Sequence, residues 1–436
     1  MTRPVRPILL AAALLAAGAA RAETVNASST TLLLGRQDFR DGSLQTAVPL
    51  YELVRLDASD LKTPIGNLEI ALSSWGAADL GDIRFWQNGA LTTGRYTGDV
   101  DVGFIRGTFL DRNLTLTLGR QMVTDGMRPV QIDGASARIV LPQGFGLQGY
   151  AGSPVAPRFM GRGGDLVTTS VRATFASGGR LSWSYPGLVE AGASVAVATD
   201  HGDPSRQDVG ADLRVTPNRY LQFVGSGWMS LYEQRLGETL LAVTVYPLPH
   251  LDFTLDYRHV EPDLFLPRNS ILSVFVSDHR NDVGGALHWG APKGVVVDAD
   301  YHVLLQDQGT GHWARAKATL HPDGPSSAVG TELSLLKSSG VSEINDNGYE
   351  ELRLFGTHEL YRAVTGTLDL MAYFFNQDVN GQPRSLAATA TVAYAFARGW
   401  RAALAGTAGS TPYLERQFEI MAKLVYEQTY ATREVK

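Results

Sequence analysis

The chain has 436 residues, 19% of them charged, with a formal net charge of −6 and no cysteine. The absence of cysteine excludes a disulfide framework, cysteine-ligated zinc or iron–sulfur clusters, and haem attached through a C-x-x-C-H sequence. An acidic chain is also a poor binder of nucleic acid, so we expect no nucleic-acid partner.

The first predicted element is a secretory signal peptide over residues 1–22. Arg3 and Arg6 precede an apolar run over residues 8–20, and Ala20-Arg21-Ala22 offers a cleavage point. The run is shorter than the roughly 20 residues that cross a bilayer, which disfavours a membrane anchor. Cleavage would leave 414 residues (436 minus 22) with a charge of −9, because three arginines are lost. We therefore expect an exported protein of a Gram-negative bacterium.

The chain beyond residue 22 repeats one pattern, in which apolar and polar residues alternate. The segment 251–258 shows it clearly, since Leu251, Phe253, Leu255 and Tyr257 alternate with Asp252, Thr254, Asp256 and Arg258. Side chains of a strand point alternately to opposite faces, so this segment has one apolar and one charged face. Twenty-two such segments run from 29–39 to 415–426 and include 165–176. They predict an all-β protein, a single transmembrane antiparallel up-and-down barrel of 18 to 22 strands over residues 23–426.

Short turns interleave with longer polar loops, which separates them onto two rims as in outer-membrane barrels. The short turns are 111–112, 142–144, 217–218, 247–249, 291–293 and 398–399, and the loops lie near 78–97, 123–131, 153–164, 261–278, 338–348 and 376–384. A soluble β-sandwich or propeller also alternates, but the chain lacks the fixed-period repeat of a propeller. The closing segment 418–426 resembles the final-strand signal that the barrel-assembly machinery reads, although a polar tail, 427–436, follows it.

The charged faces are predicted to line the lumen. Fewer than 30 residues separate Ala22 from the first clear strand, so we expect no plug domain. The lumen is then open, narrowed by infolded loops or filled by another protein. The candidate lumen-lining residues are Arg138, Arg172, Asp212, Arg214, Asp252, Asp256, Arg258, Asp298, Asp300, His302, Arg315, Lys317, Glu332, Arg353 and Asp369, with Glu351 on the same wall. A dedicated cation or anion pore would show rings of one sign, whereas these signs are mixed. They either contact a solute or brace the wall as ion pairs.

Catalytic motifs are weak. The run Gly144 to Gly149 matches a dinucleotide fingerprint literally, but it enters a strand instead of a helix that could cap a pyrophosphate. The nine histidines show no metal-ligand spacing. His302 and Asp300 share a strand face and have the chemistry of an acid–base or metal pair, but no nucleophilic serine can be assigned beside them. We therefore predict no enzyme, cofactor or metal site.

Three stretches, 118–121, 133–138 and 150–154, resemble sequences of proteobacterial porin-like outer-membrane barrels. Some members of that group are similar to the sheath proteins of porin–cytochrome conduits. The resemblance implies an outer-membrane location, with membrane lipid and lipopolysaccharide around the barrel. Two functions follow: a channel for ions or small solutes, or a structural sheath around a periplasmic multihaem cytochrome that carries all of the haem.

Overall fold

The computed structural model describes residues 24–40, 43–81, 85–87, 90–94, 96–155, 174–200, 202–265, 279–291, 294–307, 309–324, 326–340 and 348–431. The predicted signal peptide, 1–22, lies outside these residues. Within them the only helices are two short 3-10 turns, η1 (Pro142–Gly144) and η3 (Pro262–Phe265). No described helix is long and apolar enough to cross a membrane.

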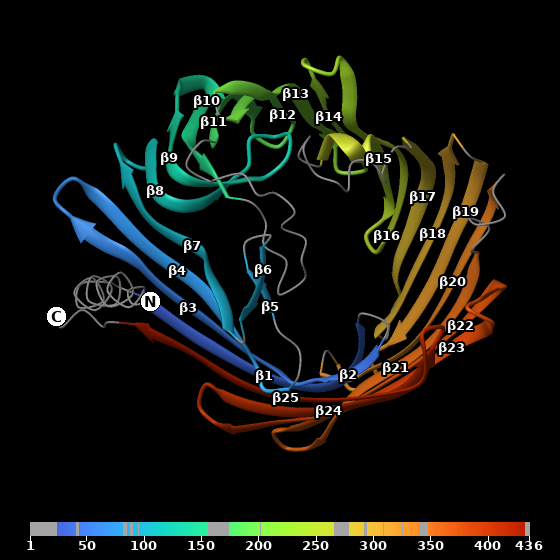
Figure 1. Cartoon of the computed structure of the whole chain (residues 1–436). Coiled ribbons are helices and arrows are strands. Elements are labelled where there is room, and N and C mark those ends of the chain that lie inside the picture. Colours follow the sequence, from blue (N-terminus) through green and yellow to red (C-terminus); the bar gives the residue numbers. More distant parts are fainter. Residues whose placement is uncertain are drawn as a thin grey trace.

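Twenty-two strands form a closed antiparallel barrel, seen as a ring in Figure 1. They are β1 (Thr24–Arg40), β3 (Pro49–Thr63), β4 (Gly66–Asp79), β7 (Tyr96–Phe109), β8 (Leu114–Val123), β9 (Val130–Val140), β10 (Phe145–Pro154), β11 (Thr174–Tyr185), β12 (Val189–Asp200), β13 (Asp203–Asn218), β14 (Leu221–Ser230), β15 (Arg235–Leu248), β16 (Leu251–Val260), β17 (Arg280–Ala291), β18 (Val295–Gln306), β19 (Gly309–Leu320), β20 (Ala328–Gly340), β21 (Tyr349–Tyr361), β22 (Val364–Val379), β23 (Gln382–Ala397), β24 (Trp400–Thr411) and β25 (Leu414–Ala431). Each pairs with the next, and β1 pairs with β25 to close the ring. The predicted barrel of 18 to 22 strands is confirmed.

Three further strands do not belong to the ring. β2 (Ser43–Ala47) pairs with the end of β1, over Arg36 to Arg40. β5 (Phe85–Gln87) and β6 (Ala90–Gly94) pair with each other as a separate two-stranded sheet. Figure 1 draws β5 and β6 within the outline of the ring, so the connection between β4 and β7 folds inward.

The outer face of the barrel is apolar. Leu255 is 70% exposed, Leu333 55% and Leu404 60%, and each alternates with inward residues along its strand. A row of contacting aromatic rings, Tyr394, Phe396, Trp400 and Tyr426, follows the ends of β23 to β25, with successive centroids 6.1, 6.3 and 4.7 Å apart. Exposed leucines bounded by aromatic rings are typical of a surface that contacts lipid.

The two rims differ as predicted. At the terminal rim, where β1 begins and β25 ends, most connections are short, such as 219–220, 249–250 and 362–363, although the connection 321–327 has seven residues. The opposite rim, called here the loop rim, carries the long connections 80–95 and 261–279. The predicted loop 376–384 is wrong, because β22 and β23 continue into it and leave only residues 380–381 as a turn.

Two other boundaries differ from expectation. Of the strand predicted at 165–176, residues 165–173 lie outside the described residues, and the described part, 174–176, is the start of β11. Ser177 and Gly179 interrupt the apolar face of β11, which is Phe175, Leu181, Trp183 and Tyr185, so the alternation is hard to read. At the carboxyl end β25 runs to Ala431, five residues beyond 426, because β1 supplies pairing partners as far as Thr24.

The weakest join in the described wall is between β7 and β8. They share seven residue pairs, from Gly103 opposite Arg120 to Phe109 opposite Leu114. Beyond that point toward the loop rim, β7 pairs with β4 only and β8 with β9 only. Gly119, which is opposite Phe104 and next to the last of these pairs, adopts φ +118°, and a Cβ there would lie 2.2 Å from the carbonyl oxygen of Gly103.

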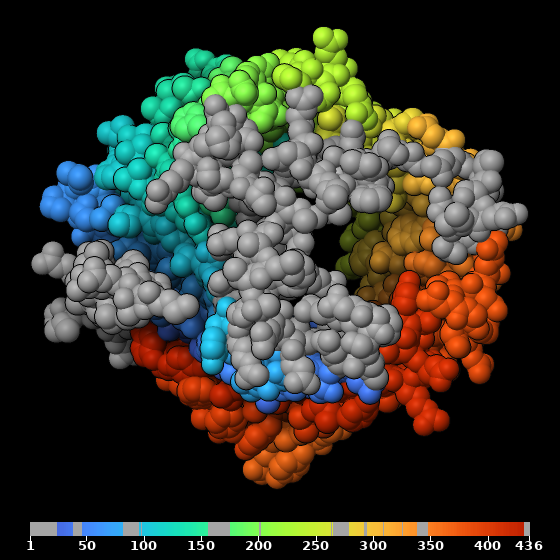
Figure 2. Space-filling view, in the orientation of Figure 1, coloured from blue at the N-terminus to red at the C-terminus, as the bar shows by residue number. Residues whose placement is uncertain are grey.

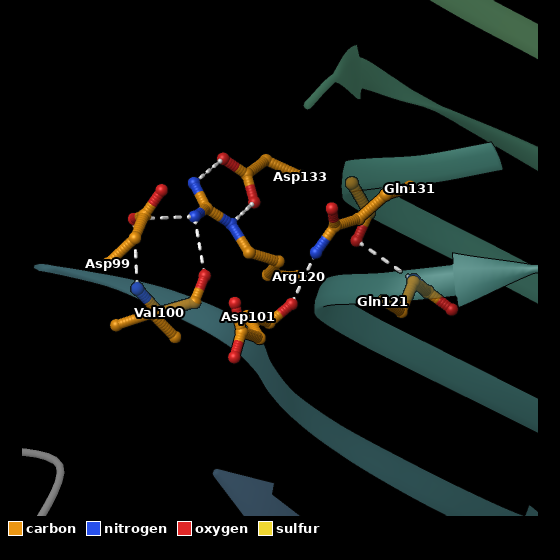
Figure 3. A network of polar contacts seen from close by, with 8 residues as sticks. Asp99, Val100, Asp101, Arg120, Gln121, Gln131 and Asp133 are labelled. Carbon is orange, nitrogen blue, oxygen red and sulfur yellow. Dashed lines mark hydrogen bonds and ion pairs between the residues drawn. The ribbon is translucent and has the colours of Figure 1, made fainter. Parts of the chain in front are cut away.

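Side chains bridge this interval, as Figure 3 shows. Arg120 donates from Nη1 to the Val100 carbonyl at 2.7 Å and to Asp99 at 3.1 Å. Its Nε and Nη2 donate to the two oxygens of Asp133, each at 2.7 Å. Gln131 donates to the Asp101 carbonyl. Backbone acceptors that a strand partner would otherwise satisfy are therefore satisfied by side chains.

Arg120→Ala should loosen this join. Two carboxylates and one carbonyl lose a charged donor, which costs about 1 to 3 kcal/mol. The temperature at which the folded form is lost on semi-native electrophoresis should fall. Arg138→Ala, an exposed arginine on the neighbouring strand β9, is the control. Equal losses in the two variants would contradict a specific role for Arg120.

The assignment of faces predicts opposite outcomes at two adjacent positions. Leu255→Arg places a charge against lipid, at roughly 2 to 4 kcal/mol if near the bilayer midplane, and should impair assembly into membranes. Thr254→Arg faces the interior, where Thr254 pairs with Thr244 at 2.9 Å, and should assemble. The yield of heat-modifiable barrel measures both, and equal damage would show that the faces are assigned wrongly.

Candidate functional site

Fourteen of the fifteen candidate residues lie within the described part of the chain, and all fourteen share the face opposite to the exposed apolar side chains. Arg172 lies outside the described residues. The face follows from the register, since residues directly opposite in an antiparallel pair point the same way. Asp298 is opposite Lys317, and Lys317 is opposite Glu332. The structure thus brings inward residues of consecutive strands directly opposite one another.

Five of these inward side chains and His288 form one continuous row across β16 to β21. The successive opposed pairs are Asp252 with His288, His288 with Asp298, Asp298 with Lys317, Lys317 with Glu332, and Glu332 with Arg353. We call these six residues the charge row. Acidic and basic groups alternate at every step. His288 was not among the candidates, although it occupies the same alternating position as its neighbours on β17.

Contacts within the row hold neighbouring strands together. His288 Nδ1 lies 2.6 Å from Asp298 Oδ1. Arg353 lies 3.7 Å from Glu332 and donates to Asp369, on β22, at 3.0 Å. The Lys317 ammonium sits 5.4 Å from the ring centroid of Phe355. The first contacts join adjacent strands, and the contact of Lys317 with Phe355 reaches from β19 across β20 to β21.

Other pairs on this wall also cross between strands. Asp300 accepts a hydrogen bond from Arg315 at 2.7 Å, and His302 faces Asp256 at 3.7 Å. The acid–base or metal pair that His302 and Asp300 could form by sequence is therefore not present between them. His302 on β18 faces Asp256 on β16 across Gly284 of β17, which is opposite both residues and places no side chain between them. Arg258 contacts Glu238 at 2.7 Å, and Arg214 contacts Glu190 at 3.6 Å. These contacts support the wall-bracing interpretation for the paired residues.

A second charged cluster surrounds the segment 124–129, between β8 and β9. The segment reaches side chains of β10 to β14, which curve around one arc of the ring in Figure 1. Six residues can span that arc only across its concave side, so the segment lies inside the barrel. We call it the infolded segment.

Asp125 anchors the infolded segment and is 1% exposed. Its carboxylate accepts hydrogen bonds from the Tyr150 hydroxyl and from the backbone N–H of Met127, both at 3.1 Å. Its carbonyl accepts from Arg180 at 3.1 Å and from the Ser194 hydroxyl. Arg180 also donates to Asp212 at 2.7 Å. Both oxygens of the buried carboxylate thus accept hydrogen bonds, which offset the cost of removing the group from water.

Arg128 anchors the same segment farther across the lumen. It donates to the Leu264 carbonyl in η3 at 3.1 Å, lies 3.9 Å from Asp208, and stacks 5.2 Å from the Trp228 ring centroid. Burial, and then the positive charge of Arg206, lowers the pKa of Arg128 to about 10. The side chain therefore remains protonated at neutral pH.

Sequence reasoning missed Asp125, Arg128 and Arg180. The first two lie in a region expected to be an ordinary loop, and nothing local distinguishes a loop that folds inward. Arg180 was missed because β11 was placed too early. Its alternation with Leu181 and Trp183 is the signal that could have identified it. Among the described residues, no group of three or more histidine, aspartate or glutamate side chains could hold a metal ion.

Comparison with known proteins identifies the fold but no family. No family model and no curated protein matches the sequence. The translocation pore of the P pilus usher PapC matches with 9% identity and a TM-score of 0.50, covering 94% of this chain and 100% of that one. OccAB4 of Acinetobacter baumannii has 9% identity and a TM-score of 0.45, covering 93% and 98%. OccK8 (OprE) of Pseudomonas aeruginosa has 9% identity and a TM-score of 0.43, with the same coverage. At these identities the likeness concerns the fold alone, that of a large closed β-barrel.

Asp125→Ala should release the infolded segment, because it removes the acceptor of two hydrogen bonds from a buried site. A loss of about 1 to 3 kcal/mol corresponds to roughly 5-fold to 150-fold acceleration of local amide exchange. Hydrogen exchange of residues 124–129 measures the effect. Arg214→Ala, which removes a wall ion pair away from the segment, should leave that exchange unchanged. Unchanged exchange in Asp125→Ala would show that other contacts hold the segment.

Proposed function

We propose that the protein is an outer-membrane channel through which ions or small hydrophilic solutes pass along the barrel lumen. Barrels of about 16 to 18 strands already enclose an aqueous channel, and 22 strands enclose more space than inward side chains fill. The infolded segment and the β5–β6 hairpin narrow this space. Figure 2 shows the barrel hollowed at its mouth beside the yellow to gold strands.

One observation carries the proposal, namely the solvent exposure of charged groups inside a closed wall. The side chain of His288 is 48% exposed, that of Asp298 32% and that of Arg353 35%. These charged side chains point to the inside of the barrel and are not packed against a core. They require water in the lumen, because removing each ion from water would cost several kcal/mol of folding free energy. A water-filled lumen is what a diffusion channel needs.

The proposal includes the route to the membrane. We infer that residues 1–22 direct export and are removed, and that the barrel-assembly machinery inserts the chain among membrane lipid and lipopolysaccharide. The alternative of a sheath around a multihaem cytochrome gains no support from the contacts described above or from the comparisons, and we do not propose it.

Purified barrel should conduct ions in planar bilayers, with weak preference between cations and anions because the wall carries both signs. Asp298→Asn combined with Asp300→Asn should shift the preference modestly toward anions, since His288 and Arg315 lose their carboxylate partners. The reversal potential in a salt gradient measures the shift.

The matched control combines Asp111→Asn with Asp323→Asn, which removes the same charge at the terminal rim. It should shift the reversal potential less. A folded wild-type barrel without conductance would refute the channel. A wall variant that shifts the potential no more than its control would refute the assignment of these residues to the conducting path.

A further inference from the structure

The charge row runs along the lumen as well as around it. Asp252 is one residue from the terminal-rim end of β16, whereas Arg353 is eight residues from the terminal-rim end of β21. Strands lie about 4.8 Å apart, so five spacings cover about 24 Å of wall. Membrane barrel strands tilt by about 35 to 45°, and a row perpendicular to them therefore climbs about 15 Å along the axis. The row forms an inclined path from the terminal rim toward the middle of the barrel.

Alternation determines which solutes this path can guide. Neighbouring steps of opposite sign are about 4.8 Å apart, which is less than the Debye length of about 8 Å at physiological salt. An ion of one sign that is attracted to one step is therefore repelled by the steps on both sides. An uncharged solute is attracted to neither the acidic nor the basic steps. A molecule with one positive and one negative group about 5 Å apart can match two successive steps together.

The steps are accessible to such a molecule. His288 and Asp298 are exposed enough to exchange their mutual contact for contact with a solute, at 48% and 32% of their side chains. Lys317, at the centre of the row, contacts an aromatic ring instead of forming a tight ion pair with Asp298 or Glu332. Its ammonium group can therefore meet a solute carboxylate with little loss of existing contacts.

We propose that the charge row makes the channel selective for small dipolar ions, such as zwitterionic dipeptides, over neutral or singly charged solutes of the same size. This inference rests on the proposed channel function and specifies its substrate class. Each solute would pass along the row with its ammonium group beside an acidic step and its carboxylate beside a basic one.

The test measures the flux of four solutes of similar size from proteoliposomes. Glycylglycine is dipolar, N-acetylglycinamide neutral, N-acetylglycine anionic and glycylglycinamide cationic. Glycylglycine should leave at least about threefold faster than each of the others in 0.1 M salt. The advantage should shrink in 1 M salt, where the Debye length falls to about 3 Å. This salt comparison needs no variant and so does not depend on the folding of one.

Lys317→Gln combined with Glu332→Gln removes two adjacent steps while keeping the net charge of the wall, and should bring the flux ratio toward one. The control, Arg401→Gln with Glu427→Gln, removes an ion pair of 3.2 Å outside the row and should retain the ratio. If all four solutes leave wild-type vesicles equally fast, the channel stands and the selectivity is refuted. If an anion or cation leaves fastest, the selectivity is likewise refuted. If none leaves, the channel function itself fails.

Discussion

Complete pairing of backbone groups inside a bilayer is the constraint on which the rest of this structure depends. Lipid offers no partner to an exposed N–H or C=O, so a sheet that spans a membrane must close on itself. Here β1 closes the ring against β25. Once the ring is closed, side chains alternate between lipid and lumen without exception along a regular strand. The join of β7 and β8 shows how the same constraint acts where pairing stops, because Arg120 and Gln131 supply the donors that a neighbouring strand would have supplied.

The closed wall leaves its charged residues on one side. Their ion pairs are partly exposed to water, so each contributes little to stability, typically about 0 to 1 kcal/mol. Their arrangement matters more than their individual strength. The electric fields of opposite charges on successive strands cancel at a distance but not at close range. A lumen of this kind distinguishes solutes by the spacing of their charges more than by their net charge.

The infolded segment follows different energetics. Asp125 and Arg128 are removed from bulk water, and each must find several partners to offset the cost. Asp125 uses Tyr150, Ser194 and Arg180, whereas Arg128 uses a carbonyl in η3, Asp208 and the face of Trp228. These contacts attach one short connection to five strands and η3. The segment is therefore fixed to the inner wall and narrows the lumen from one side.

The sequence by itself determined the barrel class, its approximate strand number and which side of each strand faces inward, because a period of two is a local property of the chain. Residues such as Asp298 and Lys317 could be assigned to the inner wall on that basis alone. Only the tertiary structure decided that these two are directly opposed, that His288 joins their row, and that His302 faces Asp256 instead of Asp300. It also decided the position of β11 and the inward path of 124–129. Register and infolding depend on contacts between different strands, which alternation within one strand does not encode.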